Sequence, residues 1–74
     1  MKSYWRRKVE IIRAYQWQVD RIVATRKPLG LFYARIGNVY VGIDNSNGQA
    51  WTEAFASLRK CKRWLCDPNA TVSN

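Results

Sequence analysis

Two β-rich runs joined by a two-residue turn constrain the fold of this 74-residue chain more than any other feature. The runs are Leu31–Ile36 and Val39–Ile43, and the Gly37-Asn38 pair between them is typical of a tight hairpin turn. Such a turn fixes the strand register. It pairs three sets of apolar residues, which we expect on the core side of the hairpin: Ile36 with Val39, Ala34 with Val41, and Phe32 with Ile43.

A long amphipathic helix is predicted before the hairpin, over residues 3–26. Its apolar residues recur at helical spacing and cover an arc of about 160°. They are Tyr4, Trp5, Val9, Ile11, Ile12, Tyr15, Val19, Ile22 and Val23. Ser3 is the expected N-cap, and Pro28 with Gly30 should end the helix and turn the chain.

A third strand and a second helix are predicted after the hairpin. Residues 49–55 are compatible with a strand or with an early helix start, and the alternation of Trp51, Glu53 and Phe55 favours the strand. The bulk of Trp51 and Phe55 favours a position in the core, whereas Glu53 between them favours an exposed face, so the burial of Trp51 stays open here. Ser57 should cap a helix from Leu58 to about Asp67. Its inner stripe would be Leu58, Cys61, Trp64 and Leu65.

These elements predict a small single-domain α+β fold of order α-β-β-β-α. We expect a three-stranded antiparallel sheet with two helices packed on one face. The domain should span residues 1–68, with 69–74 as a flexible C-terminal tail.

The charge distribution indicates the class of partner. The chain carries 13 Lys and Arg against five Asp and Glu, a formal charge of +8. Eight of the basic residues lie within 1–27 and four within 56–74, whereas 28–55 is close to neutral. A chain of this kind associates readily with polyanions.

The sequence gives little support for enzymatic activity or for a metal site. The chain has no His, its acids are scattered, and Cys61 and Cys66 alone are too few to hold zinc. We therefore expect a non-enzyme without cofactor, metal or small-molecule substrate. The reduced thiols, the missing signal-peptide pattern and the missing membrane span favour a cytoplasmic protein that does not insert into a membrane.

Trp17 is the first candidate binding residue, because it falls about 165° from the centre of the apolar arc of the predicted helix. Basic residues share that polar face: Arg6, Arg7, Arg13 and Arg21. A large exposed aromatic among arginines is typical of an interface, where it stacks on a base or fills a protein pocket. The alternative is that Trp17 covers arginine stems on a free surface or packs under the tail.

Two further surfaces are candidates. The second predicted helix carries Arg59, Lys60, Lys62 and Arg63, which could track a phosphate backbone or form an ordinary solvated face. The hairpin face opposite the core carries Tyr33, Arg35 and Tyr40, which could stack on bases or be an ordinary sheet surface.

Two resemblances follow from these residues. The α-β-β-β-α order with Arg59-Lys60-Cys61-Lys62-Arg63 resembles the double-stranded-RNA-binding domain, in which a basic cluster at the start of the last helix grips phosphates. The chain lacks that family's Gly-Pro-x-His loop. The stretches 39–45 and 50–65 resemble short proteins of phages and mobile elements of Gram-positive bacteria. This likeness implies a gene regulator or an inhibitor of a host defence enzyme, such as an anti-CRISPR protein.

We therefore predict a small basic binding protein that contacts DNA or RNA phosphates through its two helices. The alternative is a protein inhibitor or adaptor that docks on a nucleic-acid-processing enzyme or ribonucleoprotein, with Trp17 as its anchor. Self-association remains open, since the chain is near the lower size limit for an independent core.

Overall fold

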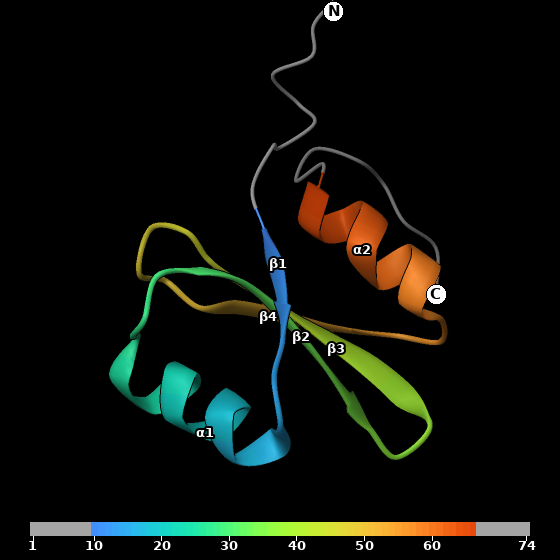
Figure 1. Ribbon diagram of the computed structural model, residues 1–74, viewed down its shortest axis with the longest axis horizontal. Helices are drawn as coiled ribbons and strands as arrows, with labels where there is room; N and C mark the ends of the chain where they lie inside the picture. Colours follow the sequence, from blue (N-terminus) through green and yellow to red (C-terminus); the bar gives the residue numbers. More distant parts are fainter. Residues whose placement is uncertain (1–9, 67–74) are drawn as a thin grey trace, which may run out of the picture.

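The structure, a computed structural model, describes residues 10–66 and contains four strands and two helices in that range (Figure 1). In chain order the elements are β1 (Ile11–Arg13), α1 (Gln16–Thr25), β2 (Gly30–Ile36), β3 (Val39–Asn45), β4 (Trp51–Phe55) and α2 (Leu58–Cys66). The predicted α+β class is confirmed. The predicted tail, 69–74, lies outside the described residues.

The strands form one mixed sheet in the order β1-β2-β3-β4. β2, β3 and β4 are antiparallel neighbours, and the three predicted pairs of the β2–β3 hairpin are confirmed. β1 runs parallel to β2, with Ile12 opposite Phe32. The prediction of a three-stranded, purely antiparallel sheet is therefore wrong, because it lacks this fourth strand.

The predicted helix over residues 3–26 is confirmed for Gln16–Thr25 and is wrong for the described residues before it. Ile11–Arg13 is a strand, and the helix begins only at Gln16. The strand places Ile11 against the side chains under α2 and Ile12 on the opposite sheet face, beside α1. One helical stripe could not reach both faces. The Ala14 amide extends the strand pairing by donating to the Tyr33 carbonyl at 2.7 Å, and residues 3–9 with the Ser3 cap lie outside the described residues.

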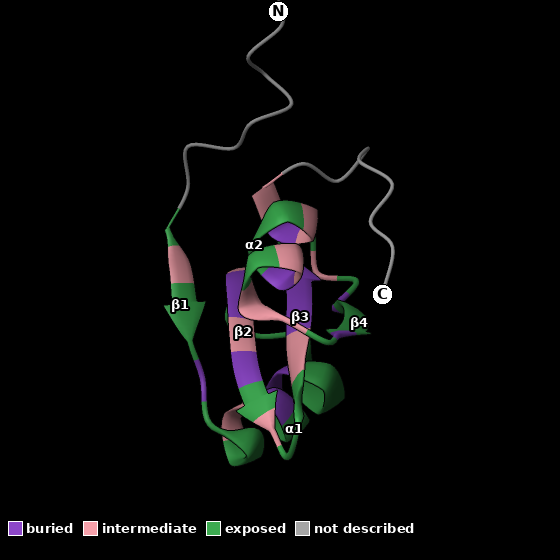
Figure 2. Cartoon of the chain, turned by 90° about the vertical axis from the view of Figure 1, so that its right-hand side faces the viewer, coloured by how far each residue is buried: buried purple, intermediate pink, exposed green. Residues whose placement is uncertain are grey.

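The two helices cover opposite faces of the sheet (Figure 2). On one face α1 contributes Val19 and Ile22 to a buried cluster with Phe32, Ala34 and Ile43. On the other face α2 contributes Cys61 and Leu65 to a cluster with Leu31 and Phe55. The expectation that both helices share one face is thus corrected. Successive β2 residues alternate between the two cores, because side chains in a strand point alternately to opposite faces.

The predicted second helix is confirmed as α2. Its first turn is capped by Ser57, whose Oγ accepts a hydrogen bond from the Lys60 amide at 3.2 Å. α2 lies close to the sheet at Gly42, where an added Cβ would come within 3.1 Å of the Cys61 sulfur and the Trp64 ring. A glycine at this position allows the helix to approach the sheet.

The buried side-chain amide of Asn45 forms hydrogen bonds with two loops at one end of the sheet. Asn45, at the end of β3, donates through Nδ2 to the carbonyls of Arg26 and Pro28 at 2.9 and 2.8 Å. Its Oδ1 accepts from the Ala50 amide at 3.0 Å. Asn45 therefore holds the end of α1, the start of β2 and the β3–β4 loop together. Neither of the two helices in the described range is long and apolar enough to cross a membrane.

Candidate nucleic-acid interface

Basic side chains from three elements gather on the side of the sheet that α2 covers. We name this set the α2 cation cluster, and its members are Arg13, Arg35, Arg59, Lys62 and Arg63. Arg59, Lys62 and Arg63 lie on the solvent side of α2, and all five residues are exposed. Lys60 lies about 160° around the helix from Lys62 and is half-buried on the opposite flank.

Tyr33 links the helix to the sheet within this cluster. The Lys62 ammonium lies 5.5 Å from the centroid of the Tyr33 ring. On the same strand, the Arg35 guanidinium lies 5.8 Å from the Tyr40 ring, and its Nε donates to the Gly37 carbonyl at 3.4 Å. Each cation–π contact contributes about 0.5–1 kcal/mol at an exposed site and restrains the orientation of its cation.

Arg13 joins the cluster through β1. It pairs in register with Tyr33, so both residues belong to the sheet face under α2. Arg13 of β1 and Lys62 of α2 are therefore both neighbours of Tyr33, and Arg35 of β2 lies over Tyr40 on the same sheet face. The pairing of β1 with β2 is what brings them together.

Acidic residues on this face lie on the other flank of α2. Asp44 and Glu53 line a hollow of about 400 Å³ beside Trp51 and Trp64. The structure answers the question that the sequence leaves open: Trp51 is 60% exposed, while Phe55 is buried. α2 covers the Phe55 end of β4 through the Phe55–Trp64 ring contact at 5.6 Å, and Trp51 lies at the other end of that strand.

The expected stacking platform of Tyr33, Arg35 and Tyr40 is not an open surface. Both tyrosines are half-buried and pack against the cluster of Leu31, Phe55, Cys61 and Leu65 under α2. Because the helices occupy opposite faces, the face expected to be free is covered. The two tyrosines support cations there, and Arg35 remains exposed.

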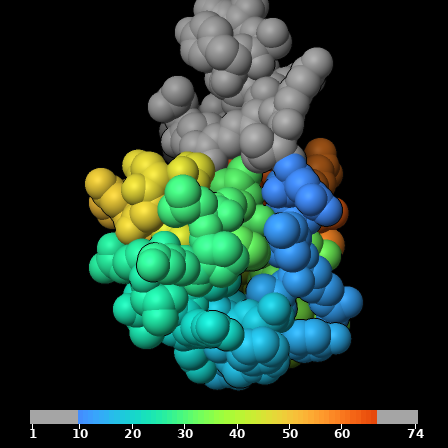
Figure 3. Space-filling view, turned by 60° about the vertical axis from the view of Figure 1, so that its left-hand side comes forward, coloured from blue at the N-terminus to red at the C-terminus, as the bar shows by residue number. Residues whose placement is uncertain are grey.

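Trp17 and Arg21 lie on the opposite side of the molecule, on α1. Trp17 is 61% exposed, which confirms its predicted exposure. Figure 3 shows this side, where α1 and β1 lie next to each other. The predicted site residues are therefore divided between two surfaces: Trp17 and Arg21 on one, and Arg13, Arg59, Lys62 and Arg63 on the other. Arg6 and Arg7 lie outside the described residues.

The two cysteines of α2 differ in burial, since Cys66 is only half-buried. Cys61 is fully buried under α2, and burial raises the pKa of its thiol from 9.0 to about 11, while the positive charge of Lys62 acts in the opposite direction. Both cysteines are free thiols. Within residues 10–66, no three side chains of His, Cys, Asp or Glu come together as a metal site would require.

Comparisons of the chain with protein-family models, with curated proteins and with solved structures found no match. The function of the site is therefore inferred from its own geometry. What that geometry provides is fixed positive charge on a helix and two adjacent strands.

The sequence identifies most of the basic residues of the α2 cation cluster, but it does not reveal that Arg13 lies on the same sheet face as the others. It assigned Arg13 to a helix, whereas the structure places it on β1 beside Tyr33. The signal was present in Ile11 and Ile12, two adjacent β-branched residues that favour a strand over a helix.

Proposed function

We propose that this chain is a small, non-enzymatic protein that binds DNA or RNA by contacting phosphates with the α2 cation cluster. The observation that carries the proposal is that cations from β1, β2 and α2 lie on one sheet face, with Arg13 in register with Tyr33, Lys62 over the Tyr33 ring and Arg35 over the Tyr40 ring, while the acids of this face lie on the other flank of α2. Positive charge concentrated in this way attracts a phosphate backbone and displaces its counterions.

The type of recognition follows from the chemistry of the cluster. Its side chains are Arg and Lys, which contact phosphate oxygens irrespective of sequence. The tyrosines that could stack on bases are half-buried beneath them. Binding should therefore depend strongly on salt and only slightly on nucleotide sequence.

The proposed site is smaller than the two-helix site that the sequence predicts. Arg21 lies on the far side of the sheet and Lys60 on the other flank of α2, so neither can join a backbone that follows Arg59, Lys62 and Arg63. Trp17 is likewise separated from this surface by the sheet. Arg6 and Arg7 stay proposed contacts, outside the described residues.

The test is fluorescence anisotropy of labelled duplex DNA, duplex RNA and single-stranded RNA over a range of salt concentrations. Each phosphate contact contributes about 0.9 to the slope of log Kd against log salt for duplex DNA and about 0.7 for a single strand. The Arg59→Gln/Arg63→Gln variant, which loses two contacts, should therefore lower that slope by about 1.8 on duplex DNA or about 1.4 on a single strand.

A matched variant, Arg21→Gln/Lys27→Gln, removes the same charge from the opposite side and should leave the slope nearly unchanged. Equal losses in both variants would show that net charge alone attracts the nucleic acid. Tight binding that is independent of salt would also contradict the proposal.

A further inference from the structure

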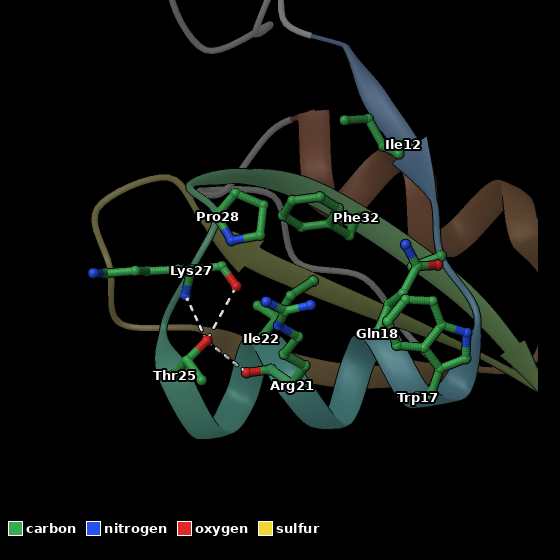
Figure 4. Close-up of a pocket in the computed structure, with 10 residues that line it drawn as sticks. Ile12, Trp17, Gln18, Arg21, Ile22, Thr25, Lys27, Pro28 and Phe32 are labelled. Carbon is green, nitrogen blue, oxygen red and sulfur yellow. Dashed lines mark hydrogen bonds between the residues drawn. The ribbon is translucent and has the colours of Figure 1, made fainter.

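An apolar groove runs along α1 on the side away from the α2 cation cluster (Figure 4). It has a volume of about 750 Å³, within the range of about 300–1,000 Å³ that is usual for ligand sites. Phe32 and Ile22 form its floor, Ile12 of β1 borders one side, and Trp17 stands at one end. We name it the α1 groove.

One flank of α1 forms a wall of the groove. Gln18, Arg21, Ile22 and Thr25 all line it, and their spacing places them along one side of a helix. The opposite wall is Ile12, which is 43% exposed because β1 is an edge strand and no further element among residues 10–66 covers it. The groove is therefore a concavity between a helix and a sheet edge, in which Ile12 and Trp17 provide the exposed apolar surface above the buried side chains of Ile22 and Phe32.

Arg21 gives the groove its charge. Its side chain rises from α1 toward the space below Phe32, whereas the Lys27 ammonium points away (Figure 4). None of the described residues that line the groove is acidic. An arginine over an apolar floor is suited to pair with a carboxylate, and that pairing strengthens when an apolar neighbour excludes water from it.

We propose that the α1 groove binds a protein segment that presents an apolar side chain next to an Asp or Glu. The apolar side chain would lie on Phe32 and Ile22, Trp17 would cover it, and Arg21 would bind the carboxylate. Exposed Trp and Arg that border one apolar pocket are the residue types that dominate binding energy at protein interfaces. This protein-binding surface is additional to the proposed phosphate-binding surface and shares no residue with it.

Other occupants fit the groove less well. A nucleotide offers several phosphates and polar base edges, but the floor is hydrocarbon and, of the two described basic residues that line the groove, only Arg21 points in. A second copy of the chain would bring another charge of +8. The basic N-terminal segment of the chain, which contains Arg6, Arg7 and Lys8, would repel Arg21.

The experiment selects short random peptides displayed on phage against the nuclease-treated full chain. We expect enriched peptides with an aromatic or aliphatic residue beside Asp or Glu. Trp17→Ala or Arg21→Gln should raise the Kd of a synthetic selected peptide by about tenfold to thirtyfold. Two matched controls on the other side of the sheet, Trp51→Ala and Arg59→Gln, should leave that Kd unchanged.

A second measurement is independent of the variants. Backbone amide shifts of Ile12 and Phe32 in the full chain should move when the selected peptide is added, and those of Arg59 and Arg63 should not. The proposal is overturned if no peptide is enriched, if the enriched peptides lack the acidic–apolar pattern, or if Arg59→Gln weakens binding as much as Arg21→Gln.

Three results would assign the groove to another occupant and would also overturn the proposal. An unlabelled oligonucleotide that displaces the peptide from the Arg59→Gln variant would indicate nucleic acid. A dimer that Trp17→Ala dissociates would indicate a second copy. Peptide binding that appears only in a full-length Tyr4→Ser/Trp5→Ser variant would indicate the chain's own N-terminal segment.

Discussion

Replacement of Asn45 by alanine should remove a large share of the stability of this fold. Asn45 is fully buried, and its amide forms three hydrogen bonds with the main chain of two loops. Two of its acceptors, the carbonyls of Arg26 and Pro28, flank Lys27 in the segment that borders the α1 groove. The amide thus connects the stability of the domain to the shape of the groove.

The expected loss is about 2–4 kcal/mol in the free energy of unfolding. Three hydrogen bonds at about 1 kcal/mol net each give about 3 kcal/mol. Arg26 and Pro28 are exposed, so water can reach their carbonyls after the substitution, whereas the amide of buried Ala50 would lack a partner. Domains of this size have a total stability of about 4–11 kcal/mol.

Urea unfolding followed by far-UV circular dichroism measures the loss. With an m-value of about 1 kcal/mol/M, the midpoint should fall by about 2–4 M while m stays constant. Asn47→Ala is the matched control, because Asn47 is exposed and accepts one 3.3 Å hydrogen bond from Gln49 in its own loop. It should change stability by less than about 0.5 kcal/mol.

A conservative variant tests the direction of the hydrogen bonds. Asn45→Asp keeps an acceptor for Ala50 but places an oxygen against the carbonyls of Arg26 and Pro28, so it should be no more stable than Asn45→Ala. An Asn45→Ala loss below about 1 kcal/mol, or no larger than that of Asn47→Ala, would refute the reasoning. An Asn45→Asp variant as stable as the wild type would contradict the role of Nδ2 as a hydrogen-bond donor.

Two further predictions concern the contact of α2 with the sheet. Gly42→Ala should lower the free energy of unfolding by about 1–3 kcal/mol, because the new Cβ would come within 3.1 Å of Trp64 and Cys61. An unchanged urea midpoint would contradict this and would show that α2 can shift away from the sheet. For Cys61, burial raises the thiol pKa from 9.0 to about 11, so its contribution to stability is fully present below pH 9.0 and is lost as pH rises toward 11. Urea midpoints from pH 8 to 11 should therefore fall more steeply for the wild type than for Cys61→Ala; parallel curves would contradict this.

Local signals in the sequence were sufficient for the hairpin and for α2. Gly37-Asn38 fixes the pairing of β2 with β3 within a few residues, and Ser57 sets the start of α2 through its own side chain. Both features depend on residues close together in the chain. Their prediction therefore needed no knowledge of the tertiary structure.

The N-terminal part could not be predicted in the same way. β1 exists because Ile11 pairs with Leu31 and Ile12 with Phe32, 20 residues further along the chain. Helical periodicity extends backward from Val19 and Ile22 through the same isoleucines, so the local pattern favoured one long helix. Long-range pairing overrode that local preference.

The faces of the sheet were misassigned for a related reason. Alternation along the hairpin was interpreted as one buried and one exposed face, although β2 contains the uninterrupted apolar run Leu31-Phe32-Tyr33-Ala34. A run of this kind is typical of a strand that is buried on both faces. Given that signal, α1 and α2 are expected on opposite faces, and Trp17 is separated from the cations of α2.

That separation changes what the net charge implies about function. A charge of +8 on a small chain suggests one continuous basic surface, and the position of Trp17 among arginines suggests an aromatic within it. Among the described residues, the sheet instead separates a cationic side, on which Tyr33 and Tyr40 are half-buried, from an apolar groove into which Arg21 points. We propose the first for a phosphate backbone and the second for an acidic protein segment, because charge density favours the former and apolar area the latter. The two proposed sites would place a nucleic acid and a protein on opposite sides of one sheet, since neither surface uses a residue of the other.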